Sequence, residues 1–161
     1  MARITIAKAL KKKNELAGQL KELQMLFNSC NSYELGTVQK FDATELMGEI
    51  VATKLSLTNL QILIQQKNAR IVDKLVRMKE TKAEIAWLRT IPTTEGEVSS
   101  YDRYSDEKVA KKKMIALYDA VWVRSCVKLN ERVISNLQDE IDEFNATTFI
   151  EFEEAKVTIP V

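Results

Sequence analysis

The stretch from Asp42 to Ile91, DATELMGEIVATKLSLTNLQILIQQKNARIVDKLVRMKETKAEIAWLRTI, decides the fold class of this chain. Its apolar residues recur every three or four positions, which is the spacing of one face of an α-helix. They are Leu46, Ile50, Leu57, Leu60, Ile64, Ile71, Leu75, Met78, Ile85 and Leu88. Asp42 and Glu45 have the form of a capping box that begins a helix, and Pro92 ends the block. The segment is therefore predicted to be helical over most of its length.

The position of Asn68 leaves the number of helices in residues 42–91 open. The phase of the apolar stripe allows one continuous helix, because the stripe continues without a shift from Leu46 to Leu88. Asparagine is, however, a poor residue inside a helix and a good cap. Two helices with a tight joint near Asn68 are equally compatible with the sequence.

Two further helices are expected on either side of this segment. One runs from about Ile6 to Phe27, with Thr5 as its N-cap and a stripe that includes Leu16, Leu20 and Leu23. The other follows Asp119, and its stripe contains Leu129, Val133, Leu137, Ile141 and Phe144. The short apolar run before Asp119, within residues 108–118, fits a helix or a strand equally well.

The remaining segments are predicted to be loops or strands. Residues 28–41 are rich in Asn and Ser and indicate a loop with an extended piece at Thr37–Phe41, and residues 92–106 indicate the longest loop. After Asn145 the sequence alternates apolar and polar residues, which is typical of a strand, and Pro160 restricts that strand to an edge. Such a strand needs a partner. The candidates are the segments near Thr37–Phe41 and Lys113–Tyr118, or another subunit.

The composition excludes several classes of function. The 161 residues contain 24 Lys and Arg against 23 Asp and Glu, so the net charge of +1 gives no general attraction to nucleic acid. The chain has no histidine, and Cys30 and Cys126 form no CxxC motif. Most zinc sites and histidine-dependent nucleophile systems are thereby excluded. No apolar run suggests a signal peptide or a membrane span, so a cytoplasmic or viral intracellular location is expected.

These patterns predict a mainly α-helical protein. We expect an antiparallel helical bundle or coiled-coil hairpin of three to four long helices, with a small β element and a strand-like C-terminal tail. The expected domains are a helical bundle at residues 1–146 and an extended C-terminal arm at residues 147–161.

Several stretches resemble the septicolysin-like family, which comprises small helical bacterial and phage-encoded proteins without an established activity. ITIAKALKKKNELAGQLKELQ at residues 4–24 resembles the first helix of that family. IQQKNARI at 64–71 and DKLVRMKETKAEIAWLR at 73–89 resemble its Asn-containing joint and third helix, and RYSDEKV at 103–109 and DEIDEFNATT at 139–148 resemble its last third. The resemblance implies a helical fold, and the family name implies activity on membranes.

The candidate functional residues are contact residues rather than catalytic ones. The interface candidates are Phe149, Ile150, Phe152, Val157 and Ile159 in the tail and Tyr101, Arg103 and Tyr104 in the long loop. Aromatic residues and Arg concentrate at binding hot spots. No catalytic residue, cofactor site or metal site is expected. The lysine runs 11–13 and 111–113 are interpreted as solvated faces, and Trp87 and Trp122 as packing residues.

The sequence thus predicts a non-enzymatic structural or assembly protein that forms a homo-oligomer or joins a larger protein assembly. Its contacts would be made by helix faces and the C-terminal arm. A phage virion component of the capsid, neck or tail fits this description. The alternatives are a nucleic-acid-associated protein that uses the lysine clusters, which is disfavoured by the charge balance, and a membrane-active septicolysin-like protein.

Overall fold

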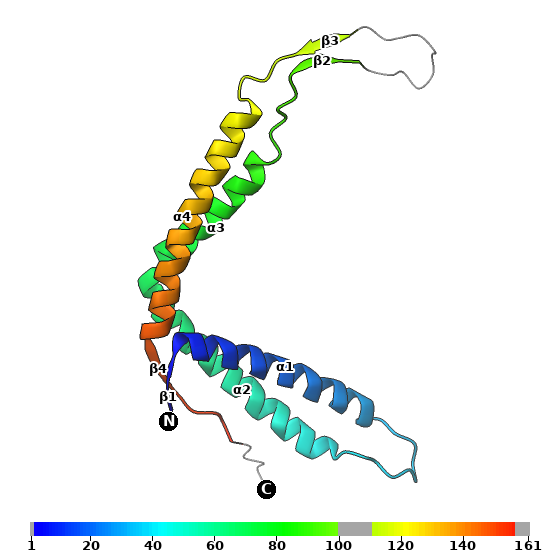
Figure 1. Cartoon of the computed structure of the whole chain (residues 1–161). Coiled ribbons are helices and arrows are strands. Elements are labelled where there is room, and N and C mark those ends of the chain that lie inside the picture. The colour runs from blue at the N-terminus through cyan, green and yellow to red at the C-terminus, as the bar shows by residue number, and fades with distance from the viewer. Residues whose placement is uncertain (1, 100–110, 157–161) are drawn as a thin grey trace, which may run out of the picture. The chain divides into compact units, whose positions relative to one another are not determined.

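The protein is mainly helical, with two small antiparallel sheets (Figure 1). The computed structural model describes residues 2–99 and 111–156. The helices are α1 (Ile6–Cys30), α2 (Ala43–Asn68), the 3₁₀ helix η1 (Ala69–Ile71), α3 (Val72–Leu88) and α4 (Ala120–Thr147). The strands are β1 (Ala2–Thr5), β2 (Gly96–Val98), β3 (Lys112–Met114) and β4 (Phe149–Phe152).

The contacts within the chain group it into two compact units. Unit 1 comprises Met1–Val72 and Ile141–Val161, and unit 2 comprises Asp73–Glu140. This grouping differs from the expected division after residue 146, because the described part of the C-terminal segment belongs to the same unit as α1 and α2.

The N-termini of α1 and α2 lie where the capping residues predicted them. The Thr5 hydroxyl accepts a hydrogen bond from the Lys8 amide at 3.3 Å. The Asp42 carboxylate accepts bonds from the amides of Thr44 and Glu45 at 2.7 and 3.3 Å. Each cap pairs amides that would otherwise have no partner in the first helical turn.

Residues 42–91 form two helices joined by the 3₁₀ turn η1. The sequence left this choice open, and the structure places the joint at the expected position. The Asn68 side chain nevertheless makes no capping hydrogen bond, so its predicted capping role is wrong. Among the described residues, its Oδ1 atom is buried without a hydrogen-bond partner.

The core of unit 1 lies between α1 and α2, which run side by side and are joined by the loop after α1 (Figure 1). Buried residues recur every seven positions along both helices: Ala9, Leu16, Leu23 and Cys30 on α1, and Leu46, Thr53 and Leu60 on α2. They form two clusters. One contains Leu16 and Leu60, and the other contains Leu23 and Leu46.

The C-terminal strand β4 pairs with β1 in an antiparallel register, with Ile4 opposite Ile150. The predicted strand is confirmed, but neither of the two partners predicted within the chain is correct. Residues 37–41 form no strand, and 113–118 contribute to a different sheet. The true partner was missed because only four residues, ARIT, precede α1. So short a segment carries too little alternation to identify a strand.

In unit 2, α3 and α4 lie side by side (Figure 1). Lys74 at the start of α3 pairs with Glu140, and Arg89 just after α3 pairs with Glu131 at 3.0 Å. Among the described residues of this unit, the buried apolar ones are Met78, Ile85, Leu88 and Val123.

Strands β2 and β3 form the second sheet, with Glu97 opposite Lys113. The prediction of an uninterrupted loop over residues 92–106 is therefore wrong at Gly96–Val98, whereas residues 112–114 adopt the strand alternative. All residues of both strands are exposed, so neither strand shows the one-sided burial that produces a recognisable alternation in sequence.

Candidate protein-interaction surface

Unit 2 exposes many large apolar side chains near the start of α4. The exposed residues before the helix are Met114, Ile115, Leu117 and Tyr118, and those within it are Val121, Trp122, Leu129 and Val133. Single exposed apolar residues are common on protein surfaces, but apolar residues that gather in one region indicate a contact site.

The start of α4 is fixed by Asp119, which positions the first aromatic pair. The Asp119 carboxylate accepts a hydrogen bond from the Trp122 amide at 2.7 Å, so the helix begins at Ala120. The rings of Tyr118 and Trp122 then lie 4.5 Å apart between centroids, at an angle of 45°. Trp122 is 40% exposed, and a tryptophan side chain has enough apolar surface to anchor a contact with another protein.

Trp122 also begins a second apolar stripe on α4. Cys126, Leu129 and Val133 follow it at intervals of four, three and four residues, which places these side chains on one helix face. The buried positions Val123 and Ile141 belong to a different series that faces inward. We call the set Trp122, Cys126, Leu129 and Val133 the α4 stripe. A helix with two apolar faces is typical of positions that contact neighbours on two sides.

Three basic side chains lie on the N-terminal half of α4, which also carries the α4 stripe. Arg124, Lys128 and Arg132 lie on the same half of α4, where Glu131 is the one acidic residue of the helix before Asp139. Glu131 is paired with Arg89, and the Arg124 side chain donates to the Ala120 carbonyl at 3.1 Å. Arg124 and Lys128 follow Trp122 and Cys126 by two residues, which is about 200° around the helix, so of the three basic residues only Arg132 flanks the α4 stripe.

The structure changes the interpretation of the tail residues. Ile150 and Phe152 are 3% and 7% exposed and belong to the core cluster that contains Leu16 and Leu60. Their prediction as contacts with other molecules is corrected, because the helices of unit 1 cover them. Phe149 points to the other side of the sheet, and the Arg3 guanidinium lies 4.5 Å from the centre of its ring.

Other candidates fall outside the described residues. Tyr101, Arg103 and Tyr104 in the long loop and Val157 and Ile159 in the tail lie there, so their predicted roles remain predictions. The sequence placed Leu129 and Val133 in one stripe with Leu137, Ile141 and Phe144 and interpreted Trp122 as a packing residue, so it did not distinguish the α4 stripe as a separate exposed face. The intervals of seven and four residues among Trp122, Leu129 and Val133 indicate a second helix face beside the inward-facing series.

The described lysines of the two clusters are partly neutralised. Lys12 pairs with Glu154 at 2.6 Å, and Lys111 pairs with Glu97 at 3.3 Å. Over residues 2–99 and 111–156, no group of three or more Cys, Asp or Glu residues is placed to hold a metal ion. None of the helices described is long and apolar enough to cross a membrane.

Comparisons with known proteins inform the fold alone. No protein-family model matches the sequence, and no curated protein matches it significantly. The fold is similar to the crystal structure of a functionally unknown conserved protein from Corynebacterium diphtheriae, with a TM-score of 0.70 and 20% sequence identity over 93% of this chain and 100% of that chain. The resemblance to the septicolysin-like family stays a prediction.

Proposed function

We propose that this protein is a non-enzymatic assembly protein that self-associates through the α4 stripe. The observation that carries the proposal is the exposure of Trp122 and Leu129, which are 40% and 60% accessible, on a helix that already has a buried inward face. Full burial of such a side chain at an interface stabilises the assembly by about 1.5–3 kcal/mol. An assembly that covers the stripe therefore has a substantial driving force.

We further infer that both units are built as coiled-coil hairpins, α1 with α2 and α3 with α4. The buried seven-residue spacing in unit 1 supports this packing, since Ala9, Leu16, Leu23 and Cys30 repeat at one heptad position. In unit 2, Met78 and Ile85 show the same interval. Two-helix hairpins have limited cores, and such elements gain stability when further helices cover their outer faces.

The cellular location of the assembly is predicted from the sequence alone. A homo-oligomer in the cytoplasm or in a phage virion stays a prediction. The ion pairs of Lys12 and Lys111 with glutamates weaken the case for phosphate binding by the lysine clusters, because each pair offsets a positive charge.

Light scattering after size exclusion tests the proposal by giving the mass of the wild-type protein and of variants. We expect a defined wild-type oligomer, and a smaller mass for Leu129→Glu, because a buried unpaired carboxylate is unfavourable. Leu35→Glu is the matched control, since Leu35 is 98% exposed in the loop after α1. A wild-type monomer at high concentration, or equal masses for the wild type and Leu129→Glu, would contradict the proposal.

A further inference from the structure

A pocket of about 570 Å³ lies between the N-terminal half of α1 and the sheet of unit 1. Three of its lining residues are apolar and come from the sheet, namely Ala2 and Ile4 of β1 and Phe152 of β4. All its other lining residues are Lys or Glu. The volume is within the range of about 300–1,000 Å³ that is usual for small-molecule sites. The pocket therefore combines apolar surface with charge.

The register of the sheet places the three apolar residues on one face. Ala2 is opposite Phe152 in the antiparallel pair, and Ile4 shares the face of Ala2 because side chains alternate along a strand. Phe152 is buried, but Ile4 is half-buried and Ala2 is exposed, so apolar surface stays accessible in the pocket. The hydrocarbon stems of the lining lysines extend this surface. An apolar chain can therefore be covered here.

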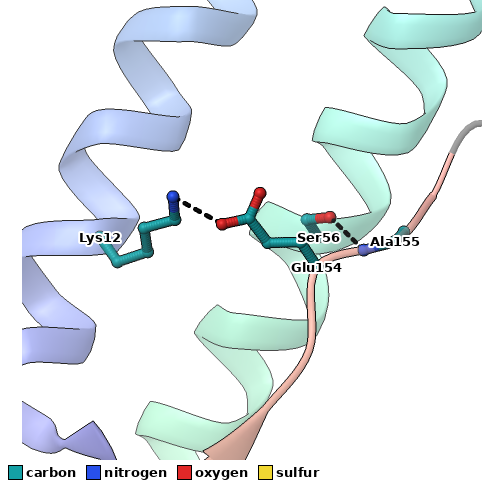
Figure 2. A network of polar contacts seen from close by, with 4 residues as sticks. All are labelled: Lys12, Ser56, Glu154 and Ala155. Atoms are coloured by element: carbon teal, nitrogen blue, oxygen red, sulfur yellow. Dashed lines mark hydrogen bonds and ion pairs between the residues drawn. The ribbon is translucent and has the colours of Figure 1, made fainter. Parts of the chain in front are cut away.

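One wall of the pocket is formed by the segment that follows β4, and two contacts hold this segment in place. The Glu154 carboxylate pairs with the Lys12 ammonium group of α1 at 2.6 Å, and the Ala155 amide donates to the Ser56 hydroxyl of α2 at 2.8 Å (Figure 2). The wall is thereby attached to both helices. A site whose walls are already fixed loses less conformational entropy when a ligand binds.

The charges that α1 contributes to the pocket are unevenly paired. They are Lys8, Lys11, Lys12 and Glu15, whose spacing places them on one helix face. Lys12 is paired with Glu154, whereas Lys8 and Lys11 are exposed and form no ion pair with any of the described residues. Glu15 lies about 10 Å from Lys8 along the helix axis. The Lys8 end of the pocket is therefore positive.

We propose that this pocket binds an amphiphile that has an anionic head and one apolar chain. The head pairs with the ammonium groups of Lys8 and Lys11, and the chain covers the apolar surface at Ile4 and Phe152. Charge complementarity selects this occupant, because an uncharged chain would not pair with the two lysines and an inorganic anion would not cover the apolar surface. Carboxylate and phosphate heads both suit an ammonium group. The inference does not depend on the α4 stripe, which lies in the other unit.

Titration calorimetry of the full chain tests the ligand class. The ligands are decanoate and decyl phosphate below the concentrations at which they form micelles, with acetate and decyltrimethylammonium as controls. We expect saturable binding of an anionic amphiphile and none of the two controls. Octanoate should bind more weakly than decanoate, by about three- to fourfold for each buried methylene group that is removed. The tighter of the two anionic ligands distinguishes a fatty carboxylate from a phosphorylated lipid as the source.

Two double variants of the full chain locate the site. Lys8→Gln combined with Lys11→Gln is expected to weaken binding of the anionic amphiphile by about tenfold, because two exposed ion pairs are lost. Lys21→Gln combined with Lys54→Gln is the matched control. It removes the same charge from exposed positions of α1 and α2 that do not line the pocket, and its affinity is expected to stay unchanged.

The other outcomes would overturn the proposal. Equal weakening in the two double variants would attribute the affinity to the overall charge of the protein. Equal binding of decyltrimethylammonium would show that the lysines do not select the ligand, and an absence of binding by both anionic amphiphiles would contradict the site itself. Binding to vesicles of anionic phospholipid without binding to decanoate or decyl phosphate would assign Lys8 and Lys11 to a membrane surface instead of a pocket.

Discussion

The Ser56 hydroxyl accepts a hydrogen bond from the Ala155 amide at 2.8 Å, and these two residues are 99 positions apart in the sequence. Ser56 is 2% exposed, so its side chain is almost entirely buried. The contact shows that the described C-terminal segment packs against α2 of unit 1 as far as Ala155.

Replacement of Ser56 tests the value of this contact. Ser56→Ala is expected to lower the free energy of unfolding by about 1–3 kcal/mol, because the Ala155 amide loses its acceptor in a part-buried position. Chemical denaturation measures the change. Ser125→Ala is the control, since the exposed Ser125 hydroxyl only bonds to the Val121 carbonyl of its own helix. Equal losses of unfolding free energy in the two variants would show that the Ser56 contact contributes no more than an exposed hydroxyl.

The two faces of β4 are expected to respond differently to truncation. Ile150→Ala removes a side chain from the core of unit 1 and is expected to cost about 2–5 kcal/mol. Phe149→Ala removes a side chain that is 42% exposed, and a much smaller loss is expected. Thermal unfolding of both variants distinguishes a core strand from a contact arm. A larger loss for Phe149→Ala would reverse the assignment of the faces.

Removal of the α4 cap tests the geometry at the start of the candidate surface. Asp119→Ala is expected to destabilise the protein by about 0.5–2 kcal/mol, because the Trp122 amide loses its acceptor. Asp119→Asn keeps an oxygen acceptor and is expected to retain most of the stability. Calorimetry gives both values. Identical losses for Ala and Asn would attribute the effect to charge instead of capping.

The exposed ion pair between Arg89 and Glu131 is expected to contribute little. Both side chains are more than half exposed, so a double-mutant cycle with Arg89→Ala and Glu131→Ala is predicted to give a coupling below about 1 kcal/mol. The coupling should fall further in high salt, since salt screens exposed charges. A large coupling that resists salt would require this pair to be shielded from solvent, for example by an assembly partner.

The sequence predicted the helices well because their signals are local. The apolar spacing in residues 42–91 and the caps Thr5 and Asp42 each depend on neighbours within a few positions. The helix predicted after Asp119 likewise begins at Ala120. Each of these elements can form from information in its own segment.

The strand partners could not be predicted for the opposite reason. The pairing of Ile4 with Ile150 joins the two ends of the described chain, and no local pattern specifies such a partner. The exposed strand β2 shows no alternation of burial. The sequence pattern merged Leu129 and Val133 with the inward-facing series of the same helix, because burial alone distinguishes the two sets.

Fluorescence quenching of Trp122 tests the central claim most directly, because it reports on the proposed contact itself. Trp87→Phe leaves Trp122 as the single tryptophan, and acrylamide quenching is measured over a wide range of protein concentrations. If chains assemble through the α4 stripe, Trp122 will be protected at high concentration and become accessible on dilution as the assembly dissociates. Strong quenching that is the same at every concentration would contradict assembly through this surface.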